Sequence, residues 1–378
     1  MDFSARLITW HAEHGRHDLP WQGTRDPYAV WLSEIMLQQT QVATVIPYYR
    51  RFLARFPDIA ALAAATEDEV LQCWSGLGYY SRGRNLHRAA RLIVDGHAGI
   101  FPSEFEKILS LPGVGRSTAA AISAFAFGQR RAILDGNVKR VLTRYLGIEG
   151  YPGGKNVESE LWRQAGQLLP ETGIEAYTQA LMDLGATVCT RTRPACGECP
   201  VANGCYARRE GRTAELPSSR SRKALPKKET VMLIIMHRGE ILLEKRPPAG
   251  IWGGLWSFPE TEAGADFARV CVERFGVAVE QRKRLPAIDH AFTHFRLRIV
   301  PQPLRVTENV HQARQGGFLW LSPEDAGDAA VPAPVRKILL KLMQGDGGSP
   351  LPDPPPQAGE GASALSPAGG SELERGPA

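Results

Sequence analysis

The chain has 378 residues, a formal net charge of +5 and six cysteines. This length is enough for two ordinary domains, the mild charge does not by itself indicate a nucleic-acid partner, and so few cysteines exclude a disulfide scaffold. The sequence has no long uncharged apolar run, and its first residues carry charges and histidines where a secretory signal would be apolar, so we expect a cytoplasmic protein without membrane spans.

Residues 1–205 are predicted to form an all-α domain. Within the stretch 26–56, Pro27 is placed for a first helical turn and apolar residues recur at intervals of three and four. Short loops are predicted where this pattern is interrupted, at 56–58, 76–82 and 97–102.

Glu34 lies in this helical stretch, on the same face as Val30 and Leu37. A carboxyl group in an apolar column should be partly desolvated, which raises its pKa. The alternative is a structural glutamate that is hydrogen-bonded to the nearby Gln38.

The stretch LPGVGRSTAAAI, residues 111–122, predicts a tight turn between two helices. Gly113 and Gly115, with Val114 between them, let backbone N–H groups approach an oxygen closely, and the following helix N-terminus favours negative charge. This is a helix-hairpin-helix DNA-binding signature, although an ordinary interhelical turn has the same local pattern.

Asp135 follows in the stretch ILDGNVKRV and is placed to cap a helix. Such a cap would aim the carboxylate and keep it ionised. Glu34 and Asp135 would then have opposite environments, one protonated and able to donate, the other ionised and able to stabilise positive charge on a sugar. That combination suits cleavage of a glycosidic bond.

Four of the six cysteines gather in one short stretch and predict a metal centre. Cys189, Cys196, Cys199 and Cys205 are spaced C-x6-C-x2-C-x5-C, and four thiolates can hold either zinc or a [4Fe–4S] cluster. The single close pair fits a loop around a cubane better than a zinc ribbon. Arg191 and Arg193 lie within this loop and would present positive charge to a phosphate backbone.

The character of the sequence changes after residue 205. Residues 206–229 are basic and poor in apolar side chains, which predicts an exposed linker. Residues 230–344 predict a mixed α/β domain, with a β-hairpin around Arg238–Gly239, a strand over 292–300 and helices over 266–275 and 332–343. The tail 345–378 is rich in proline and glycine, and we expect it to be disordered.

Together these motifs resemble the helix-hairpin-helix DNA glycosylases that carry an iron–sulfur cluster. The resemblance covers roughly residues 3–344 and is most specific for adenine DNA glycosylases of the MutY type. The stretches LPW, WLSEIMLQQTQV, GLGYYSR, LPGVGRSTA, LDGNVKRV, MDLGA and the cysteine loop occur in that family's order. The resemblance implies one [4Fe–4S] cluster and a six-helix barrel module beside an iron–sulfur module. It also implies a monomer that removes adenine opposite 8-oxoguanine or guanine in double-stranded DNA.

The resemblance also implies roles for single residues. Glu34 would protonate adenine at N7 and later help to activate water. Asp135 would stabilise the oxocarbenium ion or bond to it transiently, and Asn137 would hydrogen-bond near the sugar. The remaining matches are Trp21, Leu37 and Gln179 in the adenine pocket, Gln39 and Tyr79 as wedges in the base stack, and Thr40 and Leu77 near the damaged base. Ser117 stands where related endonucleases carry a lysine nucleophile, which implies little or no lyase activity.

The second half resembles the Nudix fold in the stretch GIWGGLWSFPE. The acidic catalytic helix of Nudix hydrolases is missing, so we expect a binding domain. Phe292, Thr293 and His294 match the loop that senses 8-oxoguanine in the family. Two alternatives stay open: a damaged-pyrimidine glycosylase with lyase activity, and a DNA-binding or nucleotide-sensing protein without catalysis.

Overall fold

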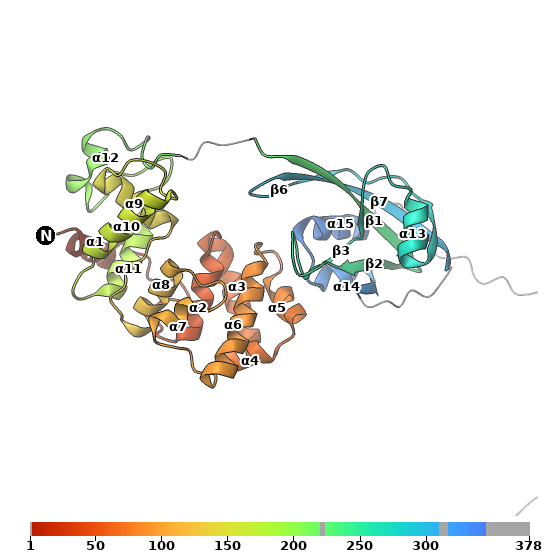
Figure 1. The fold of residues 1–378 in the computed structure, drawn as a ribbon, viewed down its shortest axis with the longest axis horizontal. Helices are drawn as coiled ribbons and strands as arrows, with labels where there is room; N and C mark the ends of the chain where they lie inside the picture. The colour runs from red at the N-terminus through yellow and green to blue at the C-terminus, as the bar shows by residue number, and fades with distance from the viewer. Residues whose placement is uncertain (1, 220–223, 310–316, 345–378) are drawn as a thin grey trace, which may run out of the picture.

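The computed structural model describes residues 2–219, 224–309 and 317–344. The first half is built of helices, and the second half holds a sheet with helices against it (Figure 1). The predicted fold class is therefore confirmed, and no strand forms within residues 2–219. No helix in the described ranges is both long and apolar enough to span a bilayer. The predicted disordered tail, 345–378, lies outside the described residues.

The helical half contains two modules with separate cores. Helices α2 to α8 surround one of them, a cluster of buried side chains that includes Trp31, Phe52 and Trp74. Their bounds are α2 Pro27–Leu37, α3 Val42–Arg55, α4 Ile59–Ala64, α5 Glu67–Trp74, α6 Ser81–His97, α7 Phe105–Leu109 and α8 Arg116–Phe127. Helix α2 begins as predicted, because Pro27 occupies its first turn and the Asp26 side chain accepts the N–H of Tyr28.

The second module combines the N-terminal helix with helices that follow the hairpin. Helix α1 (Phe3–His14) packs against α11 (Ile174–Asp183), and Leu7 and Tyr177 belong to the same buried cluster. The other elements of the module are α9 Gly136–Leu146, α10 Lys155–Gln167, the π-helical turn η1 Leu184–Val188, η2 Ala202–Gly204 and α12 Tyr206–Arg209. Because α1 packs on α11 in this module, the loop over residues 15–25 crosses to the first module, where α2 begins (Figure 1).

The exposed linker expected over 206–229 is shorter than predicted. Tyr206–Arg209 forms α12, and the buried Leu216 accepts a hydrogen bond from the Arg144 side chain at 2.8 Å. At the other end, Lys227 already belongs to strand β1. The high charge of this stretch suggested that it is exposed. Arg212 is instead held against the first half, because its Nη1 lies 2.8 Å from Oε1 of Glu149.

The second half is organised around one mixed sheet. Its central pair is parallel and joins β1 (Lys227–His237) to β7 (Arg296–Asn309), and the predicted hairpin is confirmed by the pairing of His237 with Glu240 across the Arg238–Gly239 turn. The remaining strands are β2 Glu240–Lys245, β3 Trp256–Ser257, β4 Glu260–Thr261, β5 Val277–Gln281, β6 Ile288–Ala291 and β8 Phe318–Leu321. The helices are α13 Phe267–Phe275, α14 Pro323–Asp328 and α15 Ala333–Met343, so the predicted helices at 266–275 and 332–343 are confirmed within one residue.

The strand predicted over 292–300 begins later, at Arg296. Residues 292–295 turn between β6 and β7, and the Phe292 N–H donates to the Phe295 carbonyl at 2.9 Å. Within this turn Phe292 and Phe295 stack on each other at a centroid distance of 4.6 Å.

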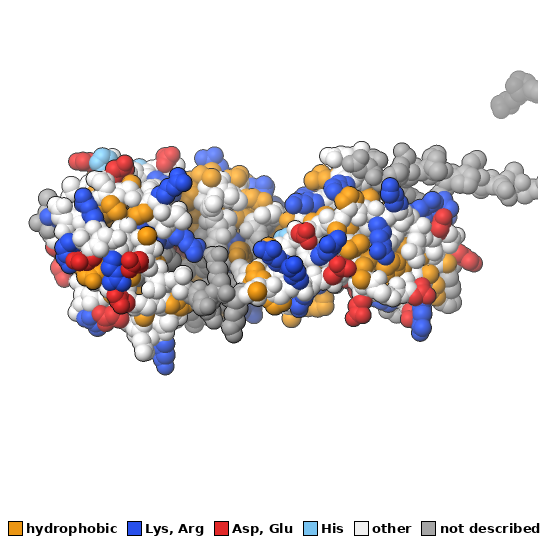
Figure 2. All heavy atoms as spheres, turned by 90° about the horizontal axis from the view of Figure 1, so that it is seen from above, with side chains coloured by type: hydrophobic (Ala, Val, Ile, Leu, Met, Phe, Trp, Pro, Cys, Tyr) orange, Lys and Arg blue, Asp and Glu red, His pale blue; other side chains and the backbone are white. Residues whose placement is uncertain are grey.

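The two halves touch along helix α5. The Ser75 hydroxyl donates to the Val331 carbonyl at 3.2 Å and accepts from the Arg336 side chain at 3.0 Å. Lys245 of β2 pairs with Asp68 at 2.6 Å, and buried side chains of both halves belong to a single apolar cluster. On the face shown in Figure 2, Lys and Arg side chains lie on both halves, interspersed with acidic ones.

Candidate active site

A pocket of about 380 Å³ opens where α2, α8 and α11 meet the loop over residues 15–25. A volume of this size is typical of small-molecule sites. Its lining contains Glu34 and all three side chains predicted to receive a base, which are Trp21, Leu37 and Gln179. These residues are far apart in sequence, and the docking of α1 on α11 brings them together.

Glu34 lies in the pocket wall beside Val30 and Leu37, as the helical spacing predicts. Burial raises the pKa of its carboxyl from 4.5 to about 8, and the negative charge of Asp135 adds to the rise. Among the described residues no hydrogen bond joins Gln38 to Glu34; the Gln38 amide nitrogen donates instead to the Gly113 carbonyl at 3.4 Å and to Thr118 Oγ1 at 3.3 Å. The arrangement therefore favours an acid over a structural glutamate.

Asp135 is the N-cap of α9, and its carboxylate accepts the N–H of Val138 at 2.7 Å. The cap prediction is confirmed, while the effect of the cap on the pKa of this carboxyl group is opposed by burial. Burial raises the pKa of Asp135 and outweighs the backbone donors of Val138 and Asn137. The negative charge of Asp135 is close enough to Glu34 to add to the rise of its pKa, although Asp135 itself does not line the pocket.

Asn137 connects this carboxylate to the cysteine loop. Its Oδ1 accepts from Arg140 Nη2 at 2.9 Å, and Arg140 Nε donates to the carbonyl of Cys189 at 2.7 Å. The turn η1 packs so closely on α9 that a Cβ atom on Gly185 would lie 2.6 Å from that of Asn137. Only glycine permits this approach, and a π-helical turn inside a helix is common at functional sites.

The predicted hairpin is formed by α7, a turn and α8. Gly113 has a φ of +80°, and both glycines of the turn are exposed, while Val114 is buried beneath them. Gly115 caps the N-terminus of α8, a twelve-residue helix without acidic residues in its first turn. Ser117 faces inward, and its hydroxyl accepts the backbone N–H of Leu134 at 2.9 Å. This hydroxyl thereby ties the hairpin to the residue before Asp135.

The two predicted wedge residues share an unusual backbone. Gln39 and Tyr79 both have positive φ, +57° and +46°, although neither is glycine, and the Tyr79 side chain is 46% exposed. Such strained, exposed positions are concentrated at functional sites. Of the residues predicted to approach the damaged base, Thr40 is partly exposed, whereas the Leu77 side chain is only 6% exposed.

Arg82 joins the two turns that carry the wedges, and the sequence analysis did not identify it. Its side chain is buried, its pKa is lowered to about 10 by that burial, and it stacks near the Tyr79 ring. On the first turn and the end of α2 it donates to Ile35 O at 2.9 Å, Met36 O at 2.8 Å, Gln38 O at 2.5 Å and Thr40 Oγ1 at 3.0 Å. On the second turn it donates to Gly78 O at 3.2 Å. The sequence offers one signal, an arginine in the first turn of a helix that follows two aromatics in YYSRGRN.

The four cysteines of the loop line one recess, together with Arg144. Arg144 donates to Cys189 Sγ at 3.4 Å, and this guanidinium would offset part of the thiolate charge. No three His, Cys, Asp or Glu side chains of the described ranges are arranged to hold a single metal ion. Four half-buried thiols around one recess fit a four-thiolate cluster. Arg191 and Arg193 are exposed on the same loop.

Comparison with known proteins settles the family. An adenine DNA glycosylase of Buchnera aphidicola subsp. Acyrthosiphon pisum is 36% identical over 340 residues, which is 89% of this chain and 96% of the relative. The human adenine DNA glycosylase is 34% identical over 407 residues, 91% of this chain and 74% of the relative. The chain belongs to the adenine DNA glycosylase family. It is an N-glycosylase of base excision repair.

Three family models match separate parts of this glycosylase. Residues 32–167 match the HhH-GPD superfamily of base excision DNA repair proteins, 189–205 match the iron–sulfur binding domain of endonuclease III, and 230–341 match the NUDIX domain. The second match resolves the choice between zinc and an iron–sulfur cluster. A solved thermostable thymine-DNA glycosylase is similar in fold and 30% identical, with a TM-score of 0.51 over 55% of this chain and 95% of the other.

In this adenine DNA glycosylase the Nudix-like sheet has arginines beside two of its acids. Arg274 of α13 holds the Glu244 carboxylate with two contacts of 2.9 Å, and Arg246 pairs with Glu260. Carboxylates paired in this way are occupied by cations of the protein itself. This pairing agrees with the expectation of a binding domain.

The predicted sensing loop lies at the tip between β6 and β7. Thr293 and His294 are exposed, and their side chains lie 3.4 Å apart at Oγ1 and Nδ1. Phe292 anchors the turn on Trp252 and Phe295. In Figure 1, β6 lies at the end of the sheet nearest the helical half.

Proposed function

We propose that the enzyme excises adenine that lies opposite 8-oxoguanine or guanine in double-stranded DNA. The nucleotide leaves the helix and its base enters the pocket between α2 and α11. Glu34 donates its proton to N7, Asp135 stabilises the cationic sugar, and water completes the hydrolysis. The observation that carries this proposal is a base-sized pocket lined by Glu34, whose pKa is raised by burial and by the nearby charge of Asp135.

The protonation states support the assigned order of steps. A carboxyl group with a pKa of about 8 is about nine-tenths protonated at pH 7, so Glu34 holds the proton that it must give. Asp135 keeps two backbone donors at the N-terminus of α9, so of the pair it is the better placed to carry negative charge. A developing positive charge on the sugar lies between them and favours ionisation of Asp135 further.

The exposed turns supply what base extrusion needs. Unstacking a base costs a few kcal/mol, and side chains that fill the vacated space offset that cost. Gln39 and Tyr79 stand exposed on strained turns that Arg82 joins, and the hairpin at Gly113–Gly115 offers backbone N–H groups to a phosphate. Arg191 and Arg193 of the cluster loop add positive charge.

The cluster is assigned a structural role. Cys189, Cys196, Cys199 and Cys205 would hold one [4Fe–4S] cluster, which supplies no group to the glycosidic bond. Bound there, it fixes the loop that presents Arg191 and Arg193 and, through Arg140, the region of Asn137.

The second domain is proposed to read the opposite base. Adenine is a normal base, and each good base contact gives only about 1–3 kcal/mol of discrimination, so a pocket for adenine alone would attack correct pairs. Thr293 and His294 offer a hydroxyl and an imidazole at an exposed tip, while Thr40 approaches from the first domain. The resulting division places the glycosylase domain at 1–205 and the reader at 230–344. We expect the enzyme to act as a monomer. Its location would be the cytoplasm, with the DNA of the nucleoid if the source is bacterial.

The decisive assay incubates the enzyme with duplexes that carry adenine opposite 8-oxoguanine, guanine, cytosine or thymine, followed by alkali to reveal abasic sites. We expect cleavage opposite 8-oxoguanine and guanine only. Glu34→Gln should lose turnover and keep duplex binding, and Thr293→Ala with His294→Ala should lower the preference for 8-oxoguanine over guanine. Normal turnover of the first variant, or an unchanged preference of the second, would remove the corresponding assignment.

Ser117 separates this proposal from a glycosylase with lyase activity. A serine hydroxyl cannot form a Schiff base, and here it is engaged with Leu134 N–H. Borohydride should therefore trap no covalent adduct with DNA. A high yield of trapped adduct would favour the lyase.

A further inference from the structure

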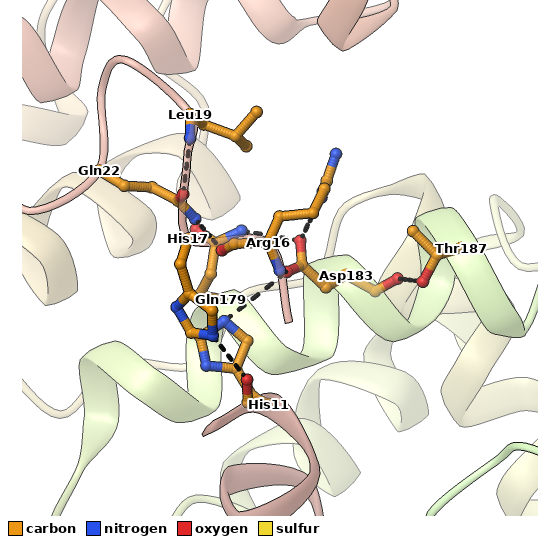
Figure 3. A network of polar contacts seen from close by, with 8 residues as sticks. All are labelled: His11, Arg16, His17, Leu19, Gln22, Gln179, Asp183 and Thr187. Atoms are coloured by element: carbon orange, nitrogen blue, oxygen red, sulfur yellow. Dashed lines mark hydrogen bonds and ion pairs between the residues drawn. The ribbon is translucent and has the colours of Figure 1, made fainter. Parts of the chain in front are cut away.

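A buried carboxylate lies behind the wall of the pocket. Asp183 ends helix α11, and its side chain is 1% exposed. Its Oδ1 accepts from Arg16 Nε and from Gln179 Nε2, both at 2.9 Å, and its Oδ2 accepts the Arg16 backbone N–H at 2.9 Å (Figure 3). Each of these partners is a donor, as an acceptor-only carboxylate requires.

The position of Asp183 is fixed from several sides. Arg16 holds it through both its backbone and its guanidinium, and Gln22 in turn donates to the Arg16 carbonyl at 2.8 Å. Thr187 donates to the Asp183 backbone carbonyl at 2.8 Å. The carboxylate therefore has little freedom to move when Gln179 changes its orientation.

The contact constrains the amide of Gln179, which lines the pocket. An amide carries an acceptor oxygen on one branch and a donor nitrogen on the other, and an unpartnered amide can exchange the two by a half turn. In this protein the half turn would place Oε1 against the Asp183 carboxylate, so that two acceptors would face each other. The nitrogen branch is thus held at Asp183, and the oxygen branch remains for another partner.

We propose that Asp183 is a positioning residue that directs the Gln179 oxygen at the bound base and so selects a 6-aminopurine over a 6-oxopurine. This inference rests on the proposed function, which places the base in this pocket. The amino group of adenine is a donor and satisfies the oxygen, whereas the oxo group of hypoxanthine is a second acceptor. Sites built to pair with a polar group reject an analogue that leaves the site unpaired.

The test measures single-turnover rates on duplexes with adenine or hypoxanthine opposite the same 8-oxoguanine. The readout is the ratio of the two rates, because a loss of stability alone lowers both rates together. Asp183→Ala frees the amide and should lower the adenine-to-hypoxanthine ratio by about tenfold, the effect of one hydrogen bond. Asp183→Asn keeps an oxygen for Arg16 and Gln179 and should stay within about threefold of the original ratio.

Two further variants show whether Asp183 acts through Gln179. Gln179→Ala should lower the ratio by itself, and adding Asp183→Ala to it should lower the ratio no further. Thr187→Val is the matched control, because it removes a bond to the backbone of Asp183 and leaves the carboxylate in place; its ratio should be unchanged. Arg16→Ala combined with Asp183→Ala removes both charges and serves if the single aspartate variant does not fold.

The outcomes distinguish this inference from the proposed function. An unchanged ratio in Asp183→Ala, or a further fall of the ratio when Gln179 is already alanine, would overturn the positioning role. Full adenine excision by Gln179→Ala with an unchanged ratio would instead show that the base does not bind in this pocket. That result would contradict the proposed function itself.

Discussion

The acid assigned to Glu34 makes a prediction about stability as well as catalysis. Between pH 4.5 and 8 the folded protein holds a proton on Glu34 that the unfolded chain has already released. The free energy of unfolding therefore falls as the pH rises through this window, by about 1.4 kcal/mol per pH unit. The whole window corresponds to at most about 5 kcal/mol, and to roughly 2–4 kcal/mol once partial contact with pocket water is allowed for.

Glu34→Gln removes this pH dependence because glutamine is neutral at every pH and nearly the same size. At pH 5 the variant and the parent should unfold at similar temperatures. At pH 8 the variant should be more stable, with a melting temperature higher by roughly 5–15 °C, since 1 kcal/mol shifts a domain of this size by about 2–4 °C. The predicted gain in stability accompanies a loss of turnover.

The assay is calorimetric unfolding of both proteins at pH 5, 6.5 and 8. Glu106→Gln is a suitable control for the exchange of a carboxyl group for an amide, because the Glu106 side chain is exposed. A difference for Glu34→Gln that does not grow between pH 5 and 8 would refute the raised pKa, and with it the reason for assigning this residue as the acid.

Three further outcomes are expected. Arg82→Met should lower the free energy of unfolding by about 1–3 kcal/mol and weaken binding to mismatched duplexes, because buried carbonyls of both wedge turns lose their donor; binding equal to that of the parent would contradict its joining role. Ser117→Ala should reduce the turnover number with little change in duplex affinity, since the buried Leu134 N–H beside Asp135 loses its acceptor. Ser117→Thr should restore the turnover number. Equal turnover of the alanine variant and the parent would show that this hydrogen bond is dispensable. Cys199→Ser should lower the iron content and visible absorption and weaken DNA binding, while Cys73→Ser, outside the loop, should change none of them.

Local sequence patterns were sufficient for much of the architecture. The proline and glycine positions marked the start of α2 and the β1–β2 hairpin, because these residues restrict or permit particular backbone angles regardless of distant contacts. The cysteine spacing located the cluster loop because all four ligands lie within one short segment. The linker was predicted to be too long, because Arg212 and Leu216 are held by partners that are remote in sequence.

The chemical identity of the site was determined by the sequence itself: a glutamate in an apolar helix face, an aspartate at a helix cap and a glycine hairpin are local facts. Only the tertiary structure decided that Glu34 and Asp135 interact, that Asp135 is buried enough to offset its cap, and that Arg82 and Asp183 hold the residues beside them. Burial and hydrogen bonding depend on which elements pack together, and here α1 packs on α11 and α2 on α8. Spacing along the chain carries no information about such contacts, because they are set by the whole fold at once.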